Sequence, residues 1–413
     1  MQRIYILLIM GMLCIHTTQS LEATPQYQQC DTFEKLSKKS TTILLYMAAD
    51  NYLQGFPYYN IAELLHEGSN DTVNLLVHLN TRLPNQKKVT QKLFIEKDKV
   101  IQIGDDTPLD SGLPSTLISA YEWAHTSFPS EQFVLVIWGN SAGPFNNKPL
   151  INDSRWSYLP RRAISIDGTS GNFLSDADLH TAISTICSHY RNNKPLDIVV
   201  CESCYACIEI AYAIQPYAHY LVSSQVPVPL NGCAYDALAA YLTKKPLDIA
   251  GAACDMARAF QKKYESDHHA LSVVSLDRLP PLVHALNEIA NELVTALQSS
   301  QKNSVLELLR EIVSSPTITT FARHDYNLVD IGNLISCLSK HSEKLYPDSA
   351  EFSTMLSSAR NSLNDVIMAN KVSTKYPEAT GLSIYVPLQN AHPAYENMLW
   401  KKESSWGKMC PEK

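Results

Sequence analysis

The sequence predicts an α/β protein built on a mostly parallel sheet that helices cover on both faces. Two observations lead to this prediction. Short apolar runs rich in β-branched residues, typical of buried strands, recur as far as about residue 240, and stretches with helical spacing stand between them. Strands that alternate with helices form parallel sheets, because each helix carries the chain back to the edge where the next strand begins.

Each expected strand is an apolar or alternating run bounded by turn residues, and each expected helix has apolar residues three or four positions apart. The expected strands are 42–48, 72–79, 133–138, 163–167, 196–200 and 220–224, with a polar hairpin or edge at 92–103. The expected helices are 59–65, 117–125, 176–189 and a short one that begins near Ile208.

The pattern changes after about residue 240. Long helical stretches follow at 246–264, 277–300, 303–313 and 347–369, and one late strand stands at 381–387. We therefore expect a signal peptide at 1–20, a lead-in at 21–40, a main α/β domain at 41–240, and a helical C-terminal region at 241–413 that completes the fold.

Composition and the N-terminus limit the class of protein. The chain has 413 residues, 45% hydrophobic content and a net charge of −7, which indicates a folded protein with no general attraction to nucleic acid. Arg3, the apolar run 4–15 and the small residues up to Ser20 are typical of a secretory signal peptide. That run is shorter than the ~20 residues of a membrane span. We expect an exported protein, periplasmic or secreted, without a membrane span.

The stretch 196–212 carries the first candidate for chemistry. A β-branched run passes through Cys201, Glu202 and Cys204 into the helix that begins near Ile208. A strand that leads into a helix places the residues between them at the carboxyl edge of the sheet, where open α/β folds bind their ligands. A cysteine at that edge, two residues after an acid, is a candidate nucleophile.

The strand 133–138 is the expected neighbour, and the loop after it would supply the other half of the site. Gly139, Asn140, Ser141 and Gly143 stand in this loop. Small residues let the backbone approach a substrate closely and present N–H groups to an oxyanion. The two loops together indicate nucleophilic chemistry on a bound substrate.

Five blocks, in order along residues 40–410, resemble the clostripain family of cysteine peptidases, which have a caspase-like fold. The blocks are Tyr-Met-Ala-Ala-Asp-Asn at 46–51, Trp-Gly-Asn-Ser-Ala-Gly at 138–143, Asp167 with Thr169 and Leu174, Glu-Ile-Ala-Tyr at 209–212, and Gly-Leu-Ser-Ile-Tyr-Val-Pro at 381–387. The resemblance implies a caspase-like sandwich, with 41–240 as the peptidase-type domain, and a peptidase chemistry that needs no cofactor.

The chain departs from the family at the catalytic positions. The family's catalytic histidine falls on Asn140, and the glycine after it falls on Ser141. Asparagine can neither take a proton from a thiol nor hold a thiolate as an ion pair. The nucleophile falls on Ser203 without a gap or on Cys204 with one deletion, and we prefer Cys204 because the order acid, small residue, cysteine is then kept.

The resemblance also implies substrate-binding residues. Glu202 falls where members that cleave after basic residues use Asp to hold the substrate's side chain. Gly139, Ser141 and Gly143 would border the substrate, and Ser224 would lie in the pocket wall that follows the next strand.

Other polar residues have ordinary explanations. Asp50 and Asn51 are as well explained by a turn with Asx hydrogen bonds, and Asp167 has no second carboxylate in sequence that would make a calcium site. Of the histidines that could replace the missing base, four are expected on helix surfaces or loops: His125, His180, His189 and His219. The fifth, His78, is expected within a strand and half-buried.

The spacing of Cys201, Cys204 and Cys207 supports a rival interpretation. Three cysteines with two residues between each pair of neighbours can hold an iron–sulfur cluster or a soft metal. A disulfide from Cys201 or Cys204 to Cys233 is another possibility in an exported protein. We expect free thiols and no metal, because the third cysteine already lies in the helix.

Three functional hypotheses follow. The preferred one is an exported clostripain-like homologue with lost or strongly reduced peptidase activity and a retained cleft for a peptide or partner protein. The second is an active cysteine endopeptidase that cleaves after basic residues, with Cys204 as nucleophile. The third is a thiol-redox or metal-binding protein that uses Cys201, Cys204 and Cys207.

Overall fold

A computed structural model describes most of the chain, with the backbone alone at 203–205 and 343–345. The described residues are 27–31, 33–139, 164–265, 269–314, 327–345, 350–387 and 395–409.

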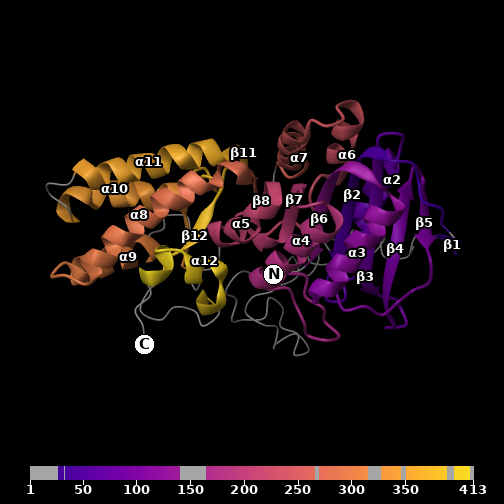
Figure 1. The fold of residues 1–413 in the computed structure, drawn as a ribbon, viewed down its shortest axis with the longest axis horizontal. Helices are drawn as coiled ribbons and strands as arrows, with labels where there is room; N and C mark the ends of the chain where they lie inside the picture. Colours follow the sequence, from indigo (N-terminus) through magenta and orange to yellow (C-terminus); the bar gives the residue numbers. More distant parts are fainter. Residues whose placement is uncertain are drawn as a thin grey trace, which may run out of the picture.

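A ten-stranded sheet forms the centre of the described structure (Figure 1). Its strands, in chain order, are β1 (Gln28–Cys30), β2 (Lys39–Ala48), β3 (Val73–Arg82), β4 (Lys88–Glu96), β5 (Lys99–Ile103), β6 (Ser130–Gly139), β7 (Leu196–Tyr205), β8 (Ala218–Ser224), β9 (Ala270–Ser275) and β11 (Ile367–Val372). Their spatial order is β1-β5-β4-β3-β2-β6-β7-β8-β9-β11. Two further strands, β10 (Leu328–Asp330) and β12 (Ser383–Tyr385), pair with each other.

The five central strands, β3-β2-β6-β7-β8, are all parallel. Antiparallel strands extend the sheet on both sides, β4 and β5 beyond β3, and β9 and β11 beyond β8. The apolar runs recognised in the sequence are buried along their length, as strands covered on both faces must be. The predicted α/β fold class is confirmed.

Helices pack on both faces of the sheet. One face carries α3 (Pro114–Ser127), α4 (Asp176–Tyr190) and α5 (Ile208–Ile214), and the other carries α2 (Pro57–Glu67), α6 (Tyr235–Lys244) and α7 (Ile249–Lys263). Alternate residues of β2 show the division, because Leu44 and Tyr46 join the first core while Ile43 and Leu45 join the second.

The C-terminal part contributes helices and also sheet. The helices are α8 (Leu279–Leu297), α9 (Lys302–Ser314), α10 (Ile331–Leu345), α11 (Ala350–Val366) and the short α12 (Leu399–Glu403). In Figure 1, α8–α11 form the end of the elongated molecule opposite β1 and β5. None of the helices in the described ranges is long and apolar enough to cross a membrane.

The sequence missed seven of these elements and misjudged one. The elements that were not predicted are helices α6, α10 and α12 and strands β1, β9, β10 and β11. The expected helix 347–369 ends at Val366, where β11 begins. The short strand expected at 163–167 is reduced, in its described part, to a single bridge between Ile164 and Leu174. The division at residue 240 stays a prediction, although the sheet itself continues across it.

A buried carboxyl group fixes the C-terminal segment to α5. Oε1 of Glu209 accepts a hydrogen bond of 2.9 Å from the backbone N–H of Tyr385 in β12. Oε2 of Glu209 is buried and accepts no hydrogen bond from the described residues. Burial, together with the nearby Asp176, raises the pKa of Glu209 to about 7.

The Glu209→Gln variant is expected to remove a pH dependence of stability. Because the pKa of Glu209 is raised from 4.5 to about 7 in the folded state, the folded chain holds this proton more tightly, and stability falls as pH rises from 4.5 to about 7. The variant should therefore gain up to about 3 kcal/mol over the native chain at pH 8. Urea unfolding of both proteins at pH 5 and pH 8 measures the difference, with Glu307→Gln, at an exposed position of α9, as control. A native-to-variant difference that does not change with pH would contradict the assignment.

Candidate functional site

The carboxyl edge of the parallel strands is where the sequence placed the site. The chain order of the sheet reverses between β2 and β6, because α2 leads from β2 to β3 on one face and α3 leads to β6 on the other. Ala48 and Gly139, the last residues of β2 and β6, are paired at this point. Open α/β sheets bind their ligands at such reversals.

Strand β6 ends in a glycine whose conformation other residues avoid. The φ angle of Gly139 is +156°, in a region that side chains exclude. Asn140, Ser141 and Gly143 lie outside the described residues, so their predicted roles stay predictions. Strand β6 itself ends at the carboxyl edge with Gly139.

Strand β7 leaves the ladder at the predicted nucleophile. Cys201 pairs with Ser223 of β8, and the next pair is Tyr205 with Ser224, so residues 202–204 bulge out within a single step of β8. The pairing of β7 with β6 also ends at Cys201, opposite Ile137. Bulges of this kind are frequent beside active sites, because they redirect side chains away from the sheet. The backbone of Cys204 thus lies in a bulge, on the strand next to β6, whose last residue is Gly139.

The Glu202 side chain is held by the segment that begins α6. Its Oε1 accepts a hydrogen bond of 2.6 Å from the backbone N–H of Cys233 and a short one from the Tyr235 hydroxyl. Burial raises the pKa of Glu202, and these hydrogen bonds and the nearby Lys263 offset part of that rise. This contact could not be predicted from the sequence, because Tyr235 lies 33 residues away.

Ser224 is buried and satisfied within its own turn. Its Oγ donates to the carbonyl of Val226 at 2.5 Å and accepts from the N–H of the same residue at 3.1 Å. The neighbouring Gln225 donates to Asp330 and Ser383, which brings the C-terminal strands against the end of β8. The predicted place of Ser224 in a pocket wall stays a prediction.

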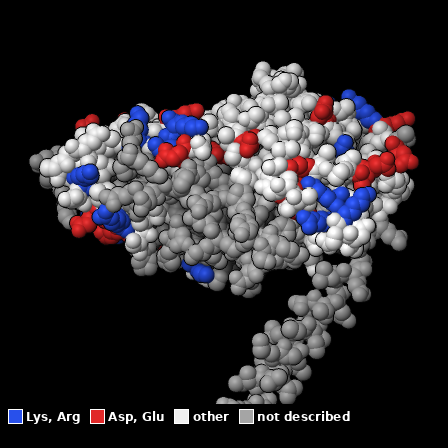
Figure 2. Space-filling model, turned by 90° about the horizontal axis from the view of Figure 1, so that it is seen from below, with Lys and Arg blue, Asp and Glu red and all other residues white. Residues whose placement is uncertain are grey.

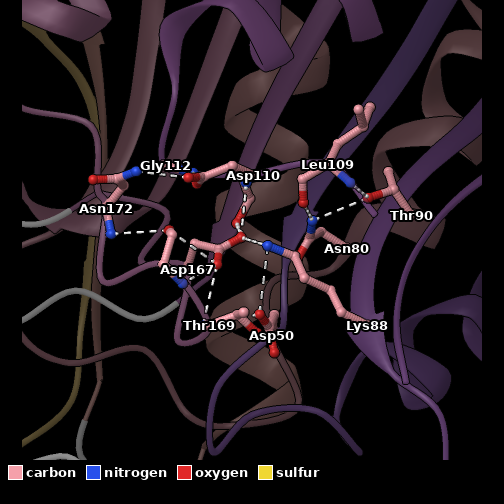
Figure 3. A network of polar contacts seen from close by, with 12 residues as sticks. Asp50, Asn80, Lys88, Thr90, Leu109, Asp110, Gly112, Asp167, Thr169 and Asn172 are labelled. Atoms are coloured by element: carbon pink, nitrogen blue, oxygen red, sulfur yellow. Dashed lines mark hydrogen bonds and ion pairs between the residues drawn. The ribbon is translucent and has the colours of Figure 1, made fainter. Parts of the chain in front are cut away.

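A buried ionic network lies at the end of β2, and the sequence did not predict it (Figure 3). Nζ of Lys88 lies 2.5 Å from Oδ2 of Asp167 and 3.6 Å from Oδ2 of Asp50. Arg82 also bonds to Asp50, and the N–H of Thr169 donates to Oδ2 of Asp50 at 3.1 Å. Burial acts to raise the pKa of Asp167, but hydrogen bonds, above all the one from Lys88, hold it below the usual range.

This network joins two of the five sequence blocks that resemble the clostripain family. Asp50 belongs to the block 46–51, while Asp167 and Thr169 belong to the third block. The predicted Asx turn is also confirmed, since the Asn51 side chain accepts from the N–H of Leu53 at 2.9 Å. The charges are balanced among the described residues, so we assign the network to fixing the loop 164–174 at the carboxyl edge. Figure 2, which views the molecule from below relative to Figure 1, shows basic side chains gathered beside acidic ones near the end that carries β1 and β5.

The named histidines are engaged elsewhere. His125 and His189 lie near the C-terminal ends of α3 and α4, and His219 lies at the start of β8, 2.9 Å from Asp277. Each of these positions is at the amino edge of the sheet. His180 contacts the carbonyl of Ala213 at 2.8 Å. His78 stacks on Tyr46, and burial lowers its pKa to about 3.

The described cysteines do not form the rival site. Cys201 and Cys207 lie in the core on one face of the sheet, whereas Cys233 lies in the core on the other face and is a free thiol. The predicted possibility of a disulfide from Cys201 or Cys204 to Cys233 is therefore wrong. Within the described ranges, no group of three His, Cys, Asp or Glu side chains could hold a metal. The side chain of Cys204 lies outside this description.

Comparisons with known proteins agree with this arrangement. The clostripain family model matches residues 45–410. An inactive zymogen of a C11 protease from Parabacteroides distasonis is similar in structure, with a TM-score of 0.61 and 22% identity over 89% of this chain and 99% of that one. The secreted C11 protease iotapain from Bacteroides thetaiotaomicron has a TM-score of 0.60 and 16% sequence identity, and the match covers 91% of this chain and 100% of that one. A secreted C11 protease of the same organism, in complex with an irreversible peptide inhibitor, has a TM-score of 0.58 and 16% identity, over 90% of this chain and 98% of that one. A search of curated protein sequences finds no significant match.

Proposed function

On the premise that the chain belongs to the clostripain family of cysteine peptidases, we propose that it is an exported homologue that has lost, wholly or nearly, its peptidase activity and keeps a cleft for a peptide or partner protein. The caspase-like fold provides the framework for this proposal.

One observation carries the loss of activity, namely the asparagine at position 140. By the family resemblance this residue stands where the catalytic histidine belongs, and it directly follows β6, the strand next to the one that carries Cys204. An amide has no basic nitrogen, so the thiol would keep its proton. The contacts of His125, His180, His189 and His219 give no support to a replacement base.

The bound state of a relative and the contacts of Glu202 support a retained cleft. One secreted C11 protease is in complex with a peptide inhibitor, and we extend peptide binding to this chain. Glu202 keeps its carboxylate at the corresponding position, with fixed hydrogen bonds from Cys233 and Tyr235. Export is supported by the signal-like residues 1–20 and by the description of two neighbours as secreted.

A turnover assay with a matched binding assay tests the proposal. The protein is incubated with a fluorogenic peptide ending in Arg, and the binding of the same peptide is measured by fluorescence anisotropy. We expect binding with a kcat/KM at least about 10³-fold below that of a clostripain with an intact dyad, because such losses follow removal of the base.

The Cys204→Ala variant decides between the two candidate functions. If the native rate is high and Cys204→Ala abolishes it, the second candidate, an active endopeptidase that cleaves after basic residues, replaces the first. Labelling with a peptide chloromethyl ketone identifies the reacting thiol, and Cys254→Ala, which removes a half-buried thiol of α7, controls for non-specific labelling.

A further inference from the structure

A chain of buried polar contacts joins the end of β6 to the bulge of β7 at residues 202–204. Nε1 of Trp138, two residues before Asn140, donates a hydrogen bond of 3.0 Å to Oδ1 of Asn60 in α2. Nδ2 of Asn60 donates to the carbonyl of Asn231 at 2.8 Å. Asn60 is fully buried. The end of β6 is therefore connected, through α2, to the loop 229–233.

This loop is clamped from several elements. Nζ of Lys263 and the hydroxyl of Tyr264, both at the end of α7, donate to the carbonyls of Asn231 and Gly232 at 3.1 and 2.8 Å. Gly232 has a φ of +69°, and an added Cβ would lie 2.9 Å from the Asn60 amide. These contacts hold the loop in one position, with Gly232 close against the Asn60 side chain.

The residues after this loop hold Glu202. The backbone N–H of Cys233 and the Tyr235 hydroxyl both donate to Oε1 of Glu202. Lys263, whose charge acts on Glu202, is paired with Glu63 at 2.7 Å. In the part of the chain that the structure describes, Glu202 forms no ion pair, and the residue is half-buried. Its charge is thus available to a cation from outside the chain.

We propose that Tyr235 and the clamped loop, with Gly232 against Asn60, are positioning elements that fix the Glu202 carboxylate to receive a guanidinium or ammonium group of a bound peptide. This inference rests on the proposed peptide-binding function and adds the residues on which selectivity depends. Tyr235 acts through Glu202 and need not touch the ligand.

The test compares two peptides that differ only in charge. Binding of a fluorescein-labelled tetrapeptide ending in Arg is compared with that of the same peptide ending in citrulline, on full-length protein carrying Cys204→Ala. We expect Tyr235→Phe to reduce the Arg-over-citrulline preference by about tenfold, because a hydrogen bond to a charged group is lost. Tyr241→Phe is the matched control. It removes a tyrosine hydroxyl from the same helix, and that hydroxyl bonds to Asp248 and not to Glu202.

A pH profile separates positioning from general stability. The hydrogen bond from Tyr235 lowers the pKa of Glu202, so Tyr235→Phe should lose the Arg preference at a higher pH than the parent does as the pH falls. The other ionisable groups around Glu202 are Cys233, Lys263 and, through Lys263, Glu63, and they are unchanged in the variant. An unchanged pH profile would contradict the proposal.

A second variant covers the case in which Tyr235→Phe does not fold. Gly232→Ala places a methyl group against Asn60 and should reduce the Arg preference several-fold. Gly104→Ala is its control, because Gly104 has the same φ of +69° with no atom within 4 Å of an added Cβ. Failure to bind either peptide would overturn the proposed function itself. Equal binding of both peptides by the parent would overturn this inference and leave the binding cleft in place.

Discussion

The double variant Asn140→His with Ser141→Gly is expected to raise kcat/KM on a peptide ending in Arg by about 10²–10⁴-fold. This is the usual contribution of a positioned general base. The structure supports the gain, because β6, which ends at Gly139, and β7, which carries Cys204, are adjacent and parallel and end at the same edge of the sheet. The glycine removes a side chain beside the restored imidazole and returns the family pattern there.

The measurement is an initial-rate assay on the native chain, the double variant and the double variant with Cys204→Ala. The third protein should return to the native rate, since the imidazole acts on that thiol. Asn140→Gln serves as a control for changing residue 140 without supplying a base. If the double variant folds, binds the peptide and gains no rate, then loss of the histidine is not what limits the site.

The second large effect concerns stability. Lys88→Met is expected to lower the free energy of unfolding by about 3–5 kcal/mol, because it leaves two buried carboxylates without their shared cation. The side chains of Asp50 and Asp167 are fully buried, and that of Lys88 is 13% exposed. Methionine keeps the length of the apolar stem, so the change removes chiefly the charge.

Urea unfolding at pH 7 measures this effect, with Lys87→Met as the matched control. Lys87 is the exposed neighbour of Lys88, and its loss should change stability by less than about 0.5 kcal/mol. Equal effects of the two substitutions would show that the network contributes no more than a surface charge. Lys88→Met should also loosen the loop 164–174, and limited proteolysis can detect this loosening.

The central strands could be predicted because strands that are buried on both faces consist of continuous apolar residues, which can be recognised locally in the sequence. The core of β6, residues 133–138, is a continuous apolar run, as a strand covered on both faces requires. Strand β11 could not be found this way. Its sequence Ile-Met-Ala-Asn-Lys-Val is mixed and half-buried, and it follows α11 without a break. Only its pairing with β9 makes it a strand.

The candidate site was predictable to the level of strands and loops. The positions of Cys204 and Glu202 on β7 followed from a strand that leads into a helix, but the bulge at 202–204 depends on the register with β8. The partners of Glu202 and of Asp50 were hidden for a related reason. Tyr235 and Lys88 lie on other elements, and a residue's neighbours across a fold leave no periodic trace in the sequence.

The antiparallel strand β9 has a consequence for how the chain is made. The parallel core ends at β8, whose outer side is paired by residues 270–275 and, beyond them, by 367–372. While the chain emerges from the ribosome, β8 must keep an open hydrogen-bonding edge until those later segments arrive. Such an edge invites pairing with another nascent chain. Productive maturation thus depends on residues 270–275 reaching the nascent core before a second molecule does.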